Sequence, residues 1–172
     1  LKILANGASH LNAALCIIEA VRIYSWCYYL VKQTVFIKGI KMIKGSCCCN
    51  SVQFELAEKP SMMGMCHCSR CRKVGASSLV FVKSDKFKIT KGRDKIATFK
   101  AQPPYEYDRC FCSVCGTSLG EVLSEMDSFP INANCLDTEF EIENQFHEFV
   151  SEKPHWFKIG DRAKQFPKHP HE

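Results

Sequence analysis

Three groups of closely spaced cysteines between residues 47 and 115 are the residues of this sequence best suited to chemistry. They form two Cys-x-Cys pairs and two Cys-x-x-Cys pairs, namely Cys47/Cys49, Cys66/Cys68, Cys68/Cys71 and Cys112/Cys115. A Cys-x-x-Cys turn directs two sulfur atoms at one point in space, as tetrahedral zinc requires with ligands about 2.3 Å from the metal. The spacing therefore predicts that these cysteines bind metal.

The number of sulfurs allows two arrangements. A structural zinc site is closed by four ligands, whereas a catalytic site has three protein ligands and one open position. The first arrangement has a closed site of Cys47, Cys49, Cys112 and Cys115, and an open site of Cys66, Cys68 and Cys71. The second joins Cys68/Cys71 to Cys112/Cys115 in a single zinc ribbon and leaves Cys47 and Cys49 unused. Spacing alone leaves both open, although the 40-residue loop is long for a ribbon and the surplus of sulfurs favours two metals.

The other cysteines, and the histidine of the middle group, are not expected to be ligands. His67 and Cys48 each lie between two cysteines and should point away from both. Cys110 lies beside a pair that is already complete. The isolated cysteines are Cys16, Cys27 and Cys135. We interpret these extra cysteines as small buried apolar residues.

The composition is that of one folded domain in a reducing compartment. Of the 172 residues, 46% are hydrophobic and 24% are charged, which is typical of globular proteins. Twelve cysteines could indicate a secreted disulfide scaffold, but the short spacings suit several separate disulfides poorly, and no convincing signal peptide precedes them. We therefore predict metal-bound thiolates and a cytoplasmic location.

The net charge of +5 is carried by the N-terminal segment. Residues 1–44 contain six basic residues and one acidic residue, while the remainder of the chain is balanced. The basic residues are dispersed among apolar ones, unlike a nucleic-acid-binding arm. A neutral cysteine-bearing body argues against nucleic acid as a partner.

The first forty residues resemble neither a membrane span nor a signal peptide. Residues 11–31 are mostly apolar, but Glu19 and Arg22 interrupt them near the middle. The first methionine is Met42. We expect the functional domain to begin there, with residues 1–41 an extra segment, either upstream translation, a loose helix or a tail. The alternative is an amphipathic helix that binds a membrane or a partner.

Short strands are expected from residue 51 onward. Apolar and polar residues alternate, or form short apolar runs, over residues 52–56, 78–82, 87–90, 96–99 and 117–123. Turn signals rich in Gly and Pro separate these segments. Helical structure is expected only near residues 69–74 and, if the N-terminal segment forms a helix, over residues 8–32. The pattern predicts a mainly β fold, as a sandwich or open barrel. We assign residues 42–166 to this domain, with the resemblance described below giving its extent, and residues 167–172 to a frayed tail.

The cysteine motifs also resemble those of a known family. Residues 45–55, 66–77, 109–119 and 154–161 are similar to segments of the glutathione-dependent formaldehyde-activating family, which includes relatives of centromere protein V. The resemblance implies a β-tent of several small sheets held by two zinc ions. It also implies the first arrangement, with Cys47, Cys49, Cys112 and Cys115 structural and Cys66, Cys68 and Cys71 catalytic.

The resemblance implies a carbon–sulfur lyase that joins glutathione to formaldehyde. An open zinc site could deprotonate the thiol or polarise the aldehyde, and three thiolate ligands make the metal a weak Lewis acid, so thiolate delivery is expected. Because glutathione carries carboxylates, we expect cationic residues to line its pocket. Arg70, Arg72 and Lys73, within or beside the open group, are the expected cofactor-binding residues, and Arg109 precedes the third cysteine group. The expected partners are a small thiol and an aldehyde, without nucleic acid or membrane.

Two other functions agree with the same residues. The protein could be a non-catalytic interaction module in which both zincs are structural. It could also be a thiol oxidoreductase, as are the methionine sulfoxide reductases, which have a similar β-tent fold. That reaction needs a reactive cysteine outside the metal sites, and Cys135 is the late candidate.

Overall fold

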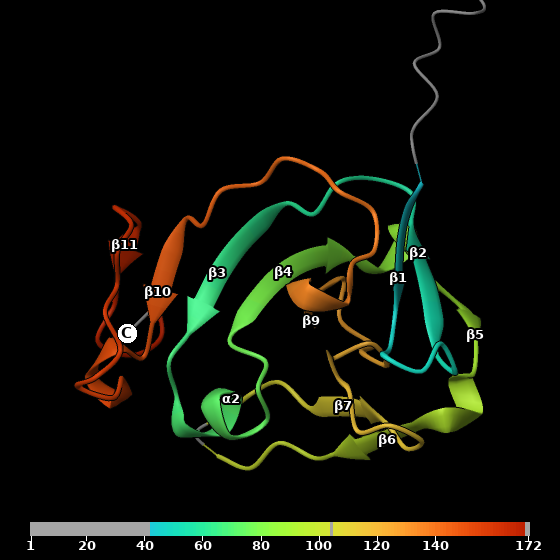
Figure 1. Cartoon of the computed structure of the whole chain (residues 1–172), viewed down its shortest axis with the longest axis horizontal. Coiled ribbons are helices and arrows are strands. Elements are labelled where there is room, and N and C mark those ends of the chain that lie inside the picture. The colour runs from blue at the N-terminus through green and yellow to red at the C-terminus, as the bar shows by residue number, and fades with distance from the viewer. Residues whose placement is uncertain (1–41, 104, 171–172) are drawn as a thin grey trace, which may run out of the picture. The chain divides into compact units, whose positions relative to one another are not determined.

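The computed structural model describes residues 42–103 and 105–170 (Figure 1). The extra segment expected at residues 1–41, with its possible helix, lies outside the described residues, as do Cys16 and Cys27. Within the described ranges, no helix is long and apolar enough to cross a membrane.

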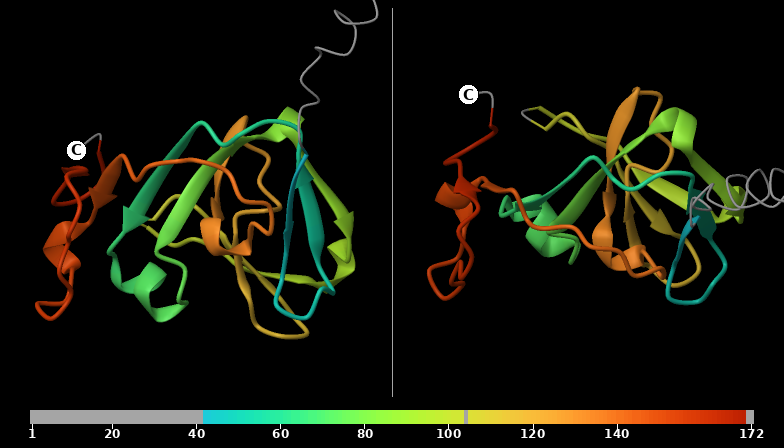
Figure 2. Two further views of the ribbon diagram at one scale, coloured as in Figure 1. Left: turned by 45° about the horizontal axis from the view of Figure 1, so that its top comes forward. Right: turned by 90° about the horizontal axis from the view of Figure 1, so that it is seen from above.

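Eleven short strands in the described ranges form two sheets. The small sheet has the order β1 (Ile43–Ser46), β2 (Gln53–Leu56), β5 (Phe87–Lys91). The large sheet has the order β11 (Lys164–Gln165), β10 (Phe146–Glu148), β3 (Met62–Cys66), β4 (Ser78–Lys83), β9 (Ser128–Asn132), β8 (Ser118–Gly120), β7 (Arg109–Cys112), β6 (Ile96–Phe99). The small sheet stands at one end of the large sheet, and β10 and β11 stand at the other (Figures 1 and 2).

The remaining regular structure is short. Among the described residues, the α-helix α2 (Ser69–Lys73) follows β3, and the 3-10 turns are η1 (Ser84–Lys86), η2 (Arg93–Lys95), η3 (Ala133–Cys135) and η4 (Val150–Glu152). The predicted mainly β fold with several sheets is therefore confirmed. The strands expected over residues 52–56, 78–82, 87–90 and 96–99 correspond to β2, β4, β5 and β6, and the expected helical turn is α2.

The main core lies between the two sheets and includes part of the first and third cysteine groups. In β2, Phe54 and Leu56 are buried while the residues between them face outward, as the period of two requires. The ring of Phe87 lies 5.3 Å from the rings of both Phe54 and Phe129. Cys47 and Cys112 belong to the same core cluster. A smaller cluster elsewhere contains Cys66, Cys68, Cys71 and Leu79.

The C-terminal segment adds two strands beside the middle cysteine group. β10 pairs in parallel with β3 and places Glu148 opposite Cys66. The carbonyl of Lys168 accepts a hydrogen bond from Phe149 N–H, and that of Pro167 accepts one from the Ser151 hydroxyl, within the segment expected to fray. Residues 171–172 lie outside the described residues.

Gly120, in β8, is a position where a side chain should destabilise the fold. Its φ is +87°, and a Cβ atom there would lie 2.5 Å from Ile131 Cα and 2.7 Å from the Pro130 carbonyl oxygen. We expect Gly120→Ala to lower the free energy of unfolding by about 2–5 kcal/mol, the sum of backbone strain and overpacking. Urea denaturation with zinc present measures this effect.

Gly75→Ala is the matched control, because Gly75 also has a positive φ of +67° but nothing lies within 4 Å of its Cβ position. We expect it to lose only the backbone contribution, about 1 kcal/mol. Equal losses in the two variants would show that close approach of β8 to β9 is not what requires glycine at position 120.

Candidate metal centres

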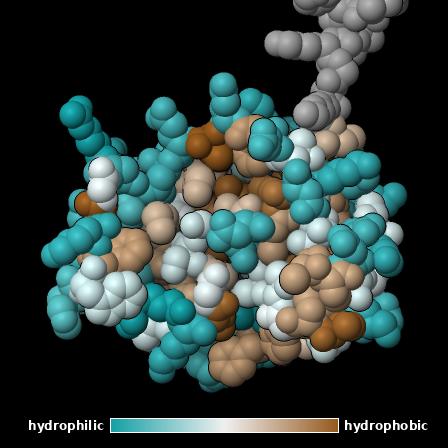
Figure 3. Space-filling model, in the orientation of Figure 1, coloured by the Kyte–Doolittle hydropathy of each residue, from teal (hydrophilic) through white to brown (hydrophobic). Residues whose placement is uncertain are grey.

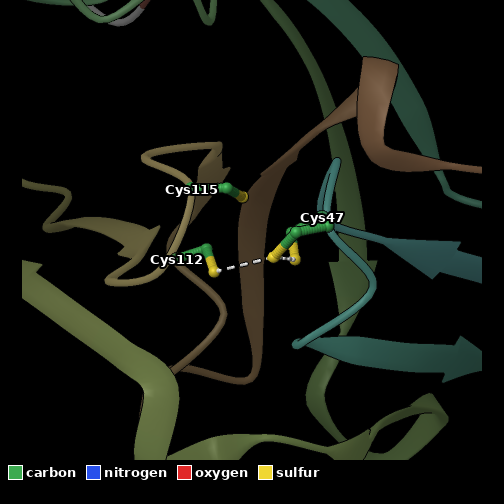
Figure 4. Close-up of side chains that lie close together, drawn as sticks. Cys47, Cys112 and Cys115 are labelled. Carbon is green, nitrogen blue, oxygen red and sulfur yellow. Dashed lines mark hydrogen bonds between the residues drawn. The ribbon is translucent and has the colours of Figure 1, made fainter.

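Four cysteines from two distant parts of the chain converge beside the main core. Cys47 and Cys49 lie in the turn between β1 and β2, and Cys112 and Cys115 lie at the turn between β7 and β8. The four sulfur atoms lie within 4.8 Å of one another, and Figure 4 shows Cys47, Cys112 and Cys115 facing a common space. We call these residues the four-cysteine group.

The sulfur separations in the four-cysteine group suit tetrahedral zinc. The Cys49 sulfur lies 3.5 Å from that of Cys47 and 3.9 Å from that of Cys112. Bonds of about 2.3 Å in a tetrahedron separate the ligands by about 3.8 Å. The donor set and its spacing therefore fit a closed structural site.

The backbone of the β7–β8 turn and the side chain of Thr117 hold the four-cysteine group in position. Gly116, with φ +74°, closes the turn and donates its N–H to the Cys112 carbonyl. The Thr117 hydroxyl lies 3.1 Å from the Cys115 sulfur and accepts a hydrogen bond from the Cys48 N–H, so it joins the two turns. The hydrogen bond from Thr117 lowers the pKa of Cys115 to about 6, which favours the thiolate that a metal requires.

The middle cysteine group forms a separate site. Cys66 ends β3, Cys68 caps the N-terminus of α2, and Cys71 lies within α2. Their sulfur atoms also lie within 4.8 Å of one another, and all three residues are buried. A single helical turn brings Cys71 back to Cys68, whose sulfur accepts the Cys71 N–H. We call these residues the three-cysteine group.

The pKa values of the thiols in the three-cysteine group are shifted in opposite directions. Hydrogen bonds from Cys66 and then Cys71 lower the pKa of Cys68 to about 2, and the hydrogen bond to Cys68 raises the pKa of Cys66. Within the group, the thiolate form is therefore most favoured at Cys68. A divalent cation can replace the thiol protons, so the donor set fits a metal with three thiolate ligands.

A buried arginine that comes from another strand contacts this group. Arg109, at the start of β7, is 5% exposed, and its Nη2 donates a hydrogen bond of 2.9 Å to the Cys71 sulfur. Arg70 Nη1 donates to the Tyr107 carbonyl, and its guanidinium lies 4.1 Å from the centre of the Tyr105 ring. The Nε atoms of both arginines are buried and have no hydrogen-bond partner among the described residues.

A small cavity of about 30 Å³ borders the three-cysteine group. Its lining includes Cys66, Cys68, Arg70, Tyr105, Arg109 and Glu148. Burial raises the pKa of Glu148. This volume holds only a few atoms. The cavity therefore admits only small groups beside the cysteine and arginine side chains that line it.

The structure separates the three predicted cofactor-binding residues. Arg70 lines the small cavity, whereas Arg72 and Lys73 are exposed and do not. Arg72 Nε donates instead to the His67 carbonyl. Tyr105 and Glu148 were not predicted from the sequence, because they lie in no motif and reach the site from distant segments.

His67 lies outside the three-cysteine group and joins a chain of hydrogen bonds that runs through the buried His147 to the exposed carboxylate of Asp161. Its Nε2 lies 2.8 Å from Nδ1 of His147, whose Nε2 lies 2.9 Å from Oδ1 of Asp161. Hydrogen bonds from Asn144 and then His147 lower the pKa of Asp161 to about 2, so this carboxylate accepts the His147 Nε2–H and His147 Nδ1 accepts from His67. The chain ties the C-terminal segment to the loop before α2.

The remaining described cysteines lie outside both groups. Cys48 is exposed, whereas Cys110 and Cys135 are buried. The Cys135 thiol donates to the Ser118 carbonyl, and burial raises its pKa to about 12. This is the reverse of what a reactive cysteine needs.

A solved structure and a family model resemble this chain. A crystal structure of a Rhodobacter sphaeroides protein is similar at 20% sequence identity and a TM-score of 0.47, covering 56% of this chain and 90% of that one. The family model described as glutathione-dependent formaldehyde-activating enzyme matches residues 42–152. This match spans more than half of the 172 residues and includes both cysteine groups. The chain therefore belongs to the family of glutathione-dependent formaldehyde-activating enzymes.

Proposed function

We propose that this protein is a zinc-dependent carbon–sulfur lyase that adds a small thiol, glutathione, to an aldehyde and reverses that addition. The observation that carries the proposal is the incomplete three-cysteine group beside a cavity. Among the described residues, no fourth cysteine, histidine or carboxylate has a ligand atom within 4.8 Å of all three sulfurs of Cys66, Cys68 and Cys71. In contrast, the four-cysteine group has the ligands for a closed site.

The chain's own residues would prepare the reaction at the three-cysteine group. Zinc bound there supplies a position at which a substrate thiol loses its proton. Arg109 Nη2 balances negative charge on Cys71, and Tyr105 and Phe149 pack against the group and limit its contact with water. In the addition, a carbon–sulfur bond forms, the carbonyl π bond breaks, and the thiol proton ends on the former carbonyl oxygen.

The unpaired guanidinium groups favour anionic reactants. Arg70 and Arg109 line the small cavity, where a carboxylate or a developing alkoxide could accept hydrogen bonds from their guanidinium groups. The proposed domain, residues 42–166, contains all of these residues. Because the reaction needs reduced thiols, we place the protein in the cytoplasm.

The two alternative functions receive less support. An oxidoreductase would need a reactive thiol outside the metal sites, and the pKa of Cys135 is raised to about 12. A purely structural role for both groups leaves the cavity beside Cys66 and Cys68 without a purpose.

Exchange between formaldehyde, glutathione and their adduct tests the proposal, because it measures catalysis even though these reactants also combine without a catalyst. We expect the zinc-containing protein to raise the exchange rate, measured by NMR at equilibrium, by at least about 100-fold at saturating enzyme. Cys48→Ser is the control, since Cys48 is exposed and belongs to neither group. A rate unchanged by fully zinc-loaded protein would reject the lyase function for this substrate pair.

A further inference from the structure

The cavity beside the three-cysteine group is too small for a whole thiol substrate. Its volume is about 30 Å³, whereas pockets for small organic ligands usually measure about 300–1,000 Å³. It can admit the reacting atoms of an aldehyde and a thiol but not the body of a tripeptide. The rest of the substrate must lie in an adjoining space.

A larger groove of about 550 Å³ lies between α2 and the β6–β7 strand pair. One wall comes from Arg70, Lys73 and Val74, and the other includes Phe99, Arg109 and Phe111. Phe99 and Arg109 are paired across β6 and β7, and Phe111 lies two residues after Arg109, so these side chains share one face. We call this space the α2–β7 groove.

The α2–β7 groove meets the small cavity at two arginines. Arg70 and Arg109 line both spaces. The exposed fraction of Arg109 is only 5%, and its Nε has no hydrogen-bond partner among the residues that the structure describes. Buried donors nearly always have an acceptor, so a guanidinium that lines both spaces and keeps one N–H unpaired favours an anionic ligand beside it.

The outer part of the α2–β7 groove is apolar. Phe99 is 58% exposed, Val74 43% and Phe111 36%. Apolar surface is visible on the lower part of the face in Figure 3, where β6 and β7 lie in Figure 1. Exposed aromatic side chains gathered in a concave site indicate a ligand with an apolar group. Neither formaldehyde nor glutathione supplies one.

We propose that the α2–β7 groove binds an apolar substituent on the sulfur of an anionic thiol adduct, so that the substrates include adducts of aldehydes larger than formaldehyde. The carboxylates of the adduct would bind Arg70 and Arg109, and its alkyl or aryl group would lie over Phe99 and Phe111. The identity of the thiol as glutathione rests on the proposed function. The reaction is the same addition, in which the thiol proton moves to the carbonyl oxygen and no oxidant is needed.

Calorimetric titration of the whole zinc-containing chain with two unreactive thioethers tests this proposal. S-hexylglutathione and S-methylglutathione carry the same charges and differ only in alkyl length. We expect the hexyl compound to bind at least about tenfold more tightly, because each buried methylene strengthens binding by up to about fourfold. The double variant Phe99→Ser/Phe111→Ser should reduce this ratio to about two or less.

Two further variants separate the contributions. Arg70→Met should weaken both thioethers by about tenfold or more and leave their ratio unchanged, since it removes a charge-assisted contact common to both. Met126→Ser is the control, because Met126 is 48% exposed and does not line the groove. It should retain the wild-type ratio. Zinc content, measured for every variant, shows that the metal sites are intact.

Three other outcomes would contradict the proposal. Equal affinities in the wild type, or binding of neither thioether, would reject the groove as an adduct site. A hexyl preference that survives in the double phenylalanine variant would place the alkyl group elsewhere. If the formaldehyde exchange assay fails but the hexyl preference depends on Phe99 and Phe111, the lyase function is rejected and the groove is retained as a binding site.

Discussion

Replacing Cys68 with serine is expected to reduce the zinc content from about two ions per chain to about one, while the chain still folds. The three-cysteine group belongs to the small cluster with Leu79 and lies apart from the main core, which contains Cys47 and Cys112. Loss of its metal should therefore leave the two sheets intact. Metal analysis of protein purified under reducing conditions, with circular dichroism of the same samples, measures both effects.

The same variant should lose catalysis. Since Cys68 is one of three proposed ligands and carries the lowest pKa of the three-cysteine group, its loss should reduce the exchange rate to the uncatalysed value, at least about 100-fold below wild type. Cys48→Ser should keep both zinc ions and full activity. One zinc in the wild type, lost together with the fold in Cys68→Ser, would instead assign Cys68 to a structural ribbon.

Replacing Cys112 with serine is expected to unfold the protein. Cys112 is fully buried in the main core and connects the β7–β8 turn to the β1–β2 turn through the four-cysteine group. Structural zinc contributes about 10–16 kcal/mol in small domains, whereas whole domains are stable by only about 5–15 kcal/mol. Thermal unfolding followed by circular dichroism should show no cooperative transition, and a strong chelator should have the same effect on the wild type.

Cys110→Ser is the matched control for this prediction. Cys110 lies two residues earlier on β7, is equally buried, and belongs to neither cysteine group. Its replacement should lower the free energy of unfolding by only about 1–3 kcal/mol and preserve the zinc content. A Cys112→Ser protein with normal stability would mean that the four-cysteine group does not hold the fold together.

Together the two cysteine variants distinguish the arrangements that spacing left open. Two separate sites predict opposite phenotypes, with a folded inactive protein from Cys68→Ser and an unfolded one from Cys112→Ser. A single ribbon of Cys68, Cys71, Cys112 and Cys115 predicts unfolding in both. In the structure, Cys112 and Cys115 lie with Cys47 and Cys49 and not with Cys68 and Cys71, which favours the first outcome.

The local features of this protein could be predicted from the sequence. Residues two or three apart in a turn hold their side chains near one another whatever the rest of the chain does, so the Cys-x-Cys and Cys-x-x-Cys pairs were recognisable at once. Alternating apolar residues identified β2, and the short segment after Cys68 identified α2. The motif positions also led to the family.

Which cations face the site depended on the tertiary structure. Successive residues of a helical turn point in different directions, so Arg70 reaches the small cavity while Arg72 and Lys73 do not. Arg109 reaches Cys71 from β7 because the order of strands in the large sheet brings that strand under α2. Arg72 and Lys73 were predicted because they follow Cys71 directly in the sequence. In the folded chain it is Arg109, from a distant strand, that contacts Cys71.

The sequence by itself determined which cysteines lie close together in Cys-x-Cys and Cys-x-x-Cys turns, since this closeness needs only local backbone geometry. The tertiary structure alone decided which pairs share a site, because Cys49 and Cys112 are 63 residues apart and meet only when the β1–β2 and β7–β8 turns pack together. It also decided where a substrate could bind, because the α2–β7 groove is built from segments about 30 to 40 residues apart, whose contacts no local pattern encodes.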